Sequence, residues 1–106
     1  MMAFWNLKTL DLQPFRTGIT SRAELGDHLI MAYMEIAAGE EDSGHLHPHD
    51  QCGVVMAGRI EMFIGTERRL LGVNESYFIP AGELHGWKTF DEPAMLLDIS
   101  SKHPEL

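Results

Sequence analysis

The sequence predicts an all-β domain, built as a sandwich or a barrel. Turn-forming residues recur at short, regular intervals through the 106-residue chain, and short apolar runs lie between them. Long amphipathic helical patterns are absent. Nothing repeats at a fixed period and no low-complexity linker divides the chain, so residues 1–106 are expected to form one domain.

The apolar runs define the expected strands. The first run is apolar on both faces, which is typical of a strand packed between two layers. The expected strands span residues 29–36, 51–57, 60–64, 69–71, 76–79, 85–89 and 94–99. Gly58-Arg59 separates the second run from the third and is predicted to form a tight hairpin, with Gly58 at positive φ.

Charge excludes several kinds of partner. The formal net charge is −8, and the basic residues are scattered along the chain. A nucleic-acid-binding protein normally carries a basic patch, so DNA, RNA and anionic membranes are not expected as partners. An anionic small substrate is still compatible with this composition, because one buried arginine can outweigh the overall charge locally.

The expected location is the cytoplasm. Cys52 is the single cysteine, so no intrachain disulfide can form, which fits a reducing compartment. The first residues lack the basic and apolar regions of a signal peptide. No apolar stretch approaches the length needed to cross a bilayer.

A cluster of histidines points to a metal site. His45, His47 and His49 lie within five residues, and His85 follows far downstream. Neutral imidazole offers a nitrogen lone pair at physiological pH, which makes histidine a common metal ligand. In a strand, His45 and His47 would share one face. Gln51 could join them after a proline-containing bend, with His85 as a fourth ligand.

Alternation along the strand after this bend separates two faces. Gln51, Gly53 and Val55 share one face, where the small residues leave room beside Gln51. Val54 and Met56 point the other way. This outward row could serve as a surface through which two copies of the chain pair, and a homodimer is predicted.

The spacing of these residues resembles a known motif. Residues 39–58 resemble the first motif of the cupin family. The matching residues are Gly39, His45, His47, Gln51 and Gly58, which are separated by five, one, three and six residues. Gln51 stands where most cupins have glutamate.

A second motif follows at the expected separation. The segment containing Pro80, Gly82 and His85 resembles the second cupin motif, and its Pro-x-Gly-x-x-His portion is intact. Glu75-Ser76 replaces the usual Gly-Asp opening of that motif. Each motif alone is a weak pattern, but the two together in this order are specific.

The resemblance implies a double-stranded β-helix, or jelly-roll cupin barrel, that holds one divalent transition metal. By the same resemblance its ligands are His45, His47, Gln51 and His85. This ligand set suits Mn, Fe, Ni, Co or Zn. A neutral amide in place of a carboxylate leaves the formal charge of the ion at two, which predicts a stronger Lewis acid. Gln51 could instead be an ordinary polar strand residue that bonds the backbone.

Among small cupins, the chain most resembles the pectin-degradation branch. Those proteins linearise 4,5-unsaturated uronic acids, and they use a carboxylate on the last strand for proton transfer. Asp98 is the matching residue here, although it could instead be a carboxylate at the rim. The branch also carries an arginine in its tail that this chain lacks; Lys102 and Arg22 are the candidate substitutes for binding a substrate carboxylate.

Three functions therefore remain open. The first is a metal-dependent enzyme that isomerises a small oxygen-rich substrate such as a sugar acid, with Asp98 or an activated water moving the proton. The second is an iron-dependent dioxygenase, and the third is a non-catalytic metal- or sugar-binding module. His49 is expected at the rim of the site. Trp87 and Phe78 are expected to fill the barrel, and Tyr77 is left open.

Overall fold

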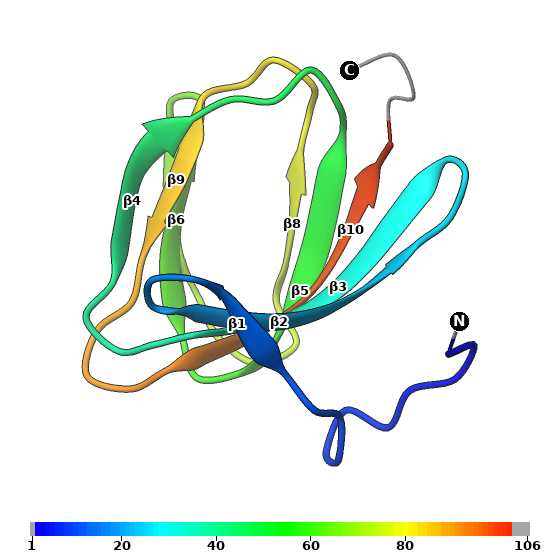
Figure 1. The fold of residues 1–106 in the computed structure, drawn as a ribbon. Helices are drawn as coiled ribbons and strands as arrows, with labels where there is room; N and C mark the ends of the chain where they lie inside the picture. Colours follow the sequence, from blue (N-terminus) through cyan, green and yellow to red (C-terminus); the bar gives the residue numbers. More distant parts are fainter. Residues whose placement is uncertain (1, 103–106) are drawn as a thin grey trace.

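Two antiparallel β-sheets face each other across the interior of the protein (Figure 1). The structure, a computed structural model, describes residues 2–102. The larger sheet has the strand order β1-β2-β3-β10-β5-β8, and the smaller has the order β4-β9-β6-β7. The strands are β1 (Gln13–Arg16), β2 (Ile19–Leu25), β3 (Leu29–Ile36), β4 (Glu41–His45), β5 (Gln51–Ala57), β6 (Ile60–Ile64), β7 (Glu67–Leu71), β8 (Ser76–Ile79), β9 (His85–Lys88) and β10 (Ala94–Ser101).

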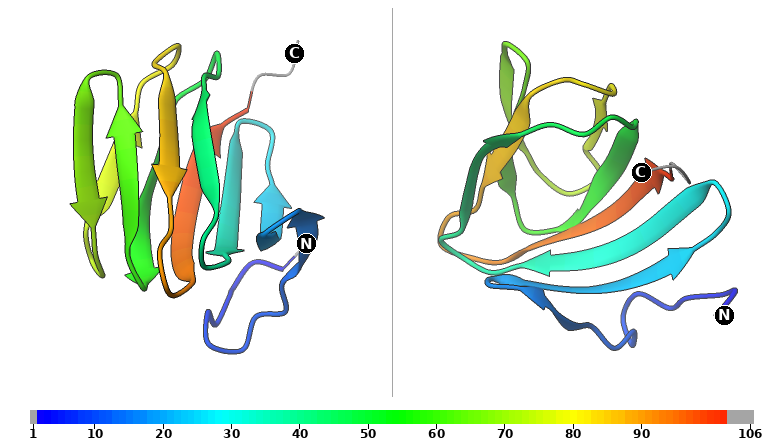
Figure 2. Two further views of the ribbon diagram at one scale, coloured as in Figure 1. Left: turned by 90° about the vertical axis from the view of Figure 1, so that its left-hand side faces the viewer. Right: turned by 45° about the horizontal axis from the view of Figure 1, so that its top comes forward.

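The connections identify the architecture as a jelly roll. From β3 onward the chain crosses from one sheet to the other at every connection except the β6–β7 hairpin. Figure 2 shows the four strands of the smaller sheet side by side in front of the larger one. Two sheets linked in this way form the double-sheet roll of antiparallel proteins. The predicted all-β jelly-roll class is therefore confirmed.

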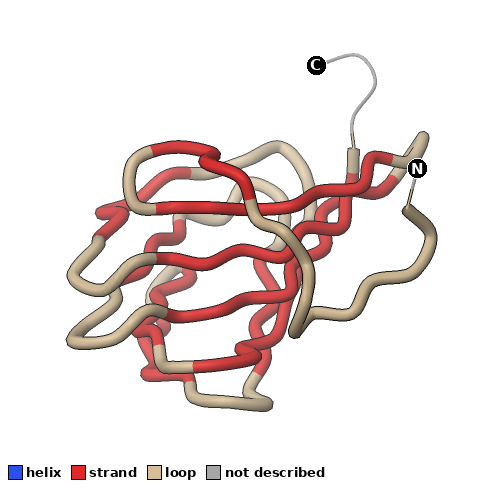
Figure 3. Tube along the Cα trace, turned by 60° about the horizontal axis from the view of Figure 1, so that its bottom comes forward, coloured by secondary structure: helices blue, strands red, loops and turns tan. Residues whose placement is uncertain are grey.

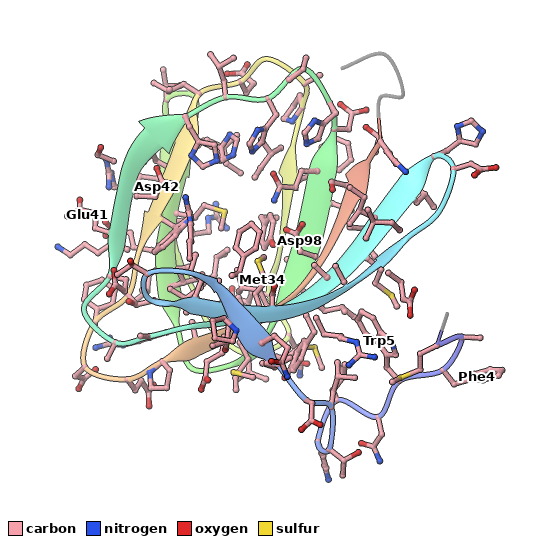
Figure 4. The ribbon with its side chains drawn as sticks, viewed as in Figure 1. Phe4, Trp5, Met34, Glu41, Asp42 and Asp98 are labelled. Carbon is pink, nitrogen blue, oxygen red and sulfur yellow. The ribbon has the colours of Figure 1, made fainter. Side chains whose placement is uncertain are left out.

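Only strands and loops are present between residues 2 and 102 (Figure 3). This part of the chain has no helix long and apolar enough to span a membrane. The segment before β1 runs along the outer side of the larger sheet, where Figure 4 places Trp5. The Met2 amide donates a hydrogen bond to Glu24 Oε1 on β2 (2.7 Å), which holds the start of this segment against the sheet.

Four strands have the bounds that the sequence predicts: β3, β5, β6 and β8. Strands β1, β2 and β4 are not among the predicted strands. β4 reads Glu-Asp-Ser-Gly-His and β1 contains Pro14, so neither shows the apolar alternation of a half-buried strand. Both are edge strands, which tolerate proline and polar residues.

The predicted hairpin at Gly58-Arg59 is wrong. Gly58 does have a positive φ of 71°, but β5 and β6 belong to different sheets, so these two residues form a crossover. A Cβ at position 58 would lie 2.2 Å from the Pro93 carbonyl oxygen, so close approach of the backbone also favours glycine. Two adjacent apolar runs look the same in sequence whether their strands pair or face each other.

The core lies between the inner faces of the two sheets. Along β10, Ala94, Leu96 and Asp98 are buried while the residues between them are less so, which shows strict alternation. The apolar cluster that fills the interior consists of Ile19, Ile36, Val55, Ile60, Met62, Leu71, Tyr77, Ile79, Ala94 and Leu96. Asp98 thus occupies an inward position that an apolar residue would normally fill.

Gly53 shapes the interior next to Asp98. On β5 it lies opposite Asp98 on one neighbouring strand and Tyr77 on the other. A Cβ at Gly53 would lie 2.3 Å from Tyr77 Oη and 2.7 Å from the Leu97 carbonyl oxygen. Because Gly53 has no side chain, the Tyr77 ring can cross β5 and reach the carboxylate of Asp98.

The outer face of the larger sheet carries the row suggested for dimerisation. Val54 is half-buried and Met56 is 37% exposed, and both alternate with inward residues as expected. The homodimer itself stays a prediction.

Gly53→Ala should destabilise the protein by about 1–3 kcal/mol, because the added methyl group overlaps the Tyr77 side chain and the β10 backbone. Urea unfolding followed by tryptophan fluorescence would measure the change. Gly72→Ala is the matched control, since its Cβ would make only an ordinary contact, 3.6 Å from Glu75 Oε1. Equal stability of the two variants would contradict this account of Gly53.

Candidate metal centre

Three histidines converge at one end of the barrel. His45 ends β4, His85 begins β9, and His47 lies in the loop after β4. One ring nitrogen from each of these residues lies within 4.8 Å of the others. The ring centroids of His45 and His85 are 4.3 Å apart, and that of His47 lies 4.6 Å from His45. Nitrogen atoms gathered this closely could hold one metal ion.

Strand pairing places two of these rings. His45 and His85 are directly opposite each other on the antiparallel strands β4 and β9, so their side chains leave the same face. The expectation that His45 and His47 share a face of one strand is wrong, because β4 ends at His45.

Loop contacts hold His47 instead. The Gly82 amide donates a hydrogen bond to the His47 carbonyl oxygen (2.7 Å). The Ala81 amide donates to Asp50 Oδ1 (2.9 Å). The loop that carries His47 is thus tied to the loop that precedes His85, and these hydrogen bonds explain why the Pro-x-Gly segment belongs to the site.

Hydrogen bonding leaves a His85 nitrogen available. Nδ1 of His85 lies 3.0 Å from the Glu83 carbonyl oxygen, which can only accept, so Nδ1 carries the proton. Nε2 then has a free lone pair, and it is buried without a hydrogen-bond partner among the described residues. A backbone carbonyl that fixes the tautomer in this way is common behind metal-ligating histidines.

The surroundings of His47 favour its neutral imidazole. Burial lowers the pKa of the His47 imidazole, and the neighbouring rings of His45, His49 and His85 lower it further. The neutral ring is the form that binds a metal.

Asp42 stands behind His45. Its Oδ2 lies 3.0 Å from His45 Nδ1 and 3.5 Å from Arg16 Nη2. Partial burial works against ionisation of Asp42, but its contacts with His45, the Gly44 amide and Arg16 outweigh burial and lower the pKa of the carboxyl. Asp42 therefore presents a negative charge to both His45 and Arg16.

Gln51 offers its oxygen to the same space. Its Nε2 donates a hydrogen bond to Asp98 Oδ2 (2.9 Å), which assigns the two ends of the amide. Oε1 is buried and has no hydrogen-bond partner among the described residues. A buried carbonyl oxygen without a donor is unusual, and a cation would satisfy it. Together with His85 Nε2, this atom shows that the residues present fit a bound metal ion.

Asp98 is held through one of its oxygens. Tyr77 Oη and Gln51 Nε2 both donate to Oδ2, and no described residue donates a hydrogen bond to Oδ1. Burial raises the pKa of Asp98, and the two hydrogen bonds oppose that rise without cancelling it. Burial and the adjacent carboxylate also raise the pKa of Tyr77, which keeps the phenol protonated as a donor. The expectation that Asp98 could be a rim carboxylate is wrong, since it is 5% exposed.

One cavity of about 330 Å³ joins these groups. Figure 4 shows Asp98 and Met34 pointing into the interior between the sheets. The residues that line the cavity are Phe15, Arg16, Ile19, Met34, Ile36, His45, His47, His49, Gln51, Met62, Tyr77, Ile79, His85, Trp87, Leu96, Asp98 and Ser100. All five residues expected from the sequence to act as ligands or as the catalytic acid–base lie on its wall; their roles stay predictions.

Other expected residues fall in different places. His49 stacks on His47 (4.7 Å between ring centroids, 11° between planes) and lines the cavity. Trp87 faces the interior as expected, but Phe78 points outward and is 61% exposed, so its expected place inside the barrel is wrong. Tyr77 takes the inward position instead.

The two candidate substitutes for the tail arginine do not line the cavity. Arg22 lies opposite Tyr33, at outward positions of the larger sheet, and Lys102 Nζ donates to the Gly26 carbonyl oxygen (3.3 Å). Arg16 lines the cavity in their place. Arg16 is not among the predicted site residues, because it lies on β1, which has no apolar alternation to reveal it as a strand.

Comparison with known proteins agrees with this architecture. The chain is 34% identical over 76 residues to the pectin degradation protein KdgF of Dickeya dadantii. This match covers 71% of this chain and 69% of that protein. The structure of KdgF from a Halomonas species superposes with a TM-score of 0.85 at 23% identity, covering 97% of both chains. An RmlC-like cupin from Shewanella frigidimarina gives 0.84 at 20% identity, covering 99% of this chain and 95% of that one. The family model for the cupin domain matches residues 32–100. The predicted resemblance to cupins and to their pectin-degradation branch is thereby confirmed, and the chain belongs to the cupin family.

Proposed function

We propose that this cupin is a metal-dependent isomerase that opens the ring of 4,5-unsaturated uronic acids. The observation that carries the proposal is the position of Asp98. This buried carboxylate lines the same cavity as three clustered imidazoles; two hydrogen bonds fix its Oδ2, and its Oδ1 accepts none from the described residues. The similarity to a pectin degradation protein supports a uronate as the substrate.

The metal would be held by His45, His47, His85 and Gln51 Oε1. Three imidazoles and one amide oxygen suit a divalent first-row ion such as Mn, Fe, Ni, Co or Zn. When bound, such an ion acts as a Lewis acid that polarises substrate oxygens.

The proposed reaction moves one proton and opens one ring. The hydroxyl at C1 of the substrate loses its proton and the bond from C1 to the ring oxygen breaks, which leaves an aldehyde at C1. The ring oxygen becomes a ketone at C5, and C4 of the former C4–C5 double bond takes up a proton. Substrate and product are isomers, so the reaction consumes no oxidant, reductant or water.

Asp98 Oδ1 would receive the first proton and deliver the second. Burial favours the protonated form of this carboxyl, so it can hold a proton between the two steps. The hydrogen bonds from Tyr77 and Gln51 to Oδ2 fix the carboxyl plane and leave Oδ1 for the substrate. Met34, Trp87 and Leu96 form apolar parts of the wall.

The function is tested by incubating the metal-loaded protein with unsaturated galacturonate made by a pectate lyase. The ultraviolet absorbance of the conjugated double bond should disappear in air and under nitrogen alike. Loss of absorbance only with oxygen would favour the dioxygenase, and no loss with any unsaturated uronate would reject the proposal.

Asp98→Asn should lower kcat by about 100-fold or more, the range associated with loss of an acid–base group. Metal content should stay unchanged, because Asp98 is not among the proposed ligands. Asp91→Asn is the control, since the Asp91 side chain is 84% exposed and forms an ion pair with the exposed Arg59 across 3.5 Å. Full activity of Asp98→Asn would show that another group carries the proton.

His85→Ala should weaken metal binding by more than about 100-fold. Loss of a residue that only hydrogen-bonds to a ligand costs up to about 100-fold, and loss of a ligand itself should cost more. Inductively coupled plasma mass spectrometry after dialysis would measure the bound metal. His28→Ala serves as control, because His28 is exposed on the β2–β3 turn. Equal metal content in the two variants would contradict the proposed centre.

A further inference from the structure

We propose that Arg16 binds the carboxylate of an anionic substrate in the cavity. The inference deepens the proposed function and rests on it for the identity of the substrate as a uronate. Arg16 lies at the end of β1, a strand that contributes nothing else to the proposed chemistry.

An irregularity in β1 brings Arg16 to the side of the sheet that faces the cavity. Pro14 pairs with Thr20, but Arg16 pairs with Ile19, so Phe15 is an extra residue in the strand. Such a β-bulge re-aims side chains, and bulges are frequent beside functional sites. In a regular strand Phe15 and Arg16 would point to opposite faces, yet both line the cavity here. Arg16 shares the face of Ile19, which is buried in the core.

Charge in the cavity gives Arg16 a distinct role. Among the described residues that line the cavity, it is the only arginine or lysine. The whole chain carries a formal charge of −8, so an anion that enters the cavity needs a local cation to offset general repulsion. The planar guanidinium is suited to hold a carboxylate through two parallel hydrogen bonds.

The ion pair with Asp42 positions Arg16 without using all its donors. The contact is a single one, from Nη2 to Asp42 Oδ2 at 3.5 Å, and the Arg16 side chain is still 53% exposed. An exposed contact of this length contributes little energy. Asp42 Oδ2 is also 3.0 Å from His45 Nδ1. One carboxylate oxygen therefore contacts both the Arg16 guanidinium and a ring of the histidine cluster. A sugar acid could therefore place its carboxylate at Arg16 while its other oxygens face the cluster.

Binding of galacturonate and of neutral galactose to the metal-loaded protein tests the assignment by calorimetry. Arg16→Gln should weaken galacturonate binding by about 10- to 100-fold and leave galactose binding unchanged. The galacturonate affinity of Arg16→Lys should lie between those of the wild type and Arg16→Gln. Lysine keeps the positive charge but cannot form two parallel hydrogen bonds to a carboxylate. Arg22→Gln, on the outer face, is the matched control and should bind as the wild type does. Metal content and the unfolding midpoint, measured for each variant, should equal those of the wild type.

In turnover of unsaturated galacturonate, Arg16→Gln should raise KM while kcat changes little. If the wild type turns over no uronate but Arg16→Gln still weakens galacturonate binding selectively, the proposed function fails and the role of Arg16 stands. Unchanged galacturonate affinity in Arg16→Gln would overturn the role of Arg16 even if turnover is observed. Equal loss of galacturonate and galactose binding, loss of metal, or no galacturonate binding by the wild type would overturn it as well.

Discussion

Asp98 is a carboxylate at an inward position of the central strand pair, and the rest of the site depends on how it is accommodated. Two hydrogen bonds to one oxygen, from Tyr77 and Gln51, offset part of the cost of burying it. Tyr77 reaches Asp98 only because Gly53 lacks a side chain. The same hydrogen bond from Gln51 Nε2 leaves Gln51 Oε1 as the end of the amide without a partner among the described residues, and Gln51 lines the same cavity as the three histidines.

This arrangement gives a physical reason for glutamine at a position where most cupins have glutamate. A glutamate at position 51 has no N–H to donate, so it would set a second carboxylate against Asp98 in a buried site. The glutamine amide avoids that repulsion: its Nε2 donates to Asp98, and its Oε1 is left for the proposed metal. From the sequence, the neutral charge of Gln51 bears only on the metal; the structure adds its contact with Asp98.

Much of the fold and site follows from the sequence, because motif spacing and alternation are local properties. His45, His85 and Gln51 come together as their motifs predict, and Asp98 faces inward with the parity of Leu96. His47 reaches the cluster through loop hydrogen bonds that no periodicity encodes. Tyr77 and Phe78 are adjacent and both aromatic, so only packing decides which of them faces the core. The position of Arg16 depends on a bulge in a proline-containing edge strand, which leaves no local pattern in the sequence. Whether the turn at Gly58 is a hairpin or a crossover depends on which distant strands pair, and this leaves no local pattern either.

A crystal structure of the metal-loaded protein, with diffraction recorded at the absorption edge of the metal, tests the central claim most directly. The account predicts one ion bound by His45, His47, His85 and Gln51 Oε1, with Gln51 Nε2 still donating to Asp98. Asp98 should lie outside the coordination sphere with its Oδ1 open to the cavity. An ion ligated by Asp98, or a Gln51 side chain turned away from the ion, would contradict it.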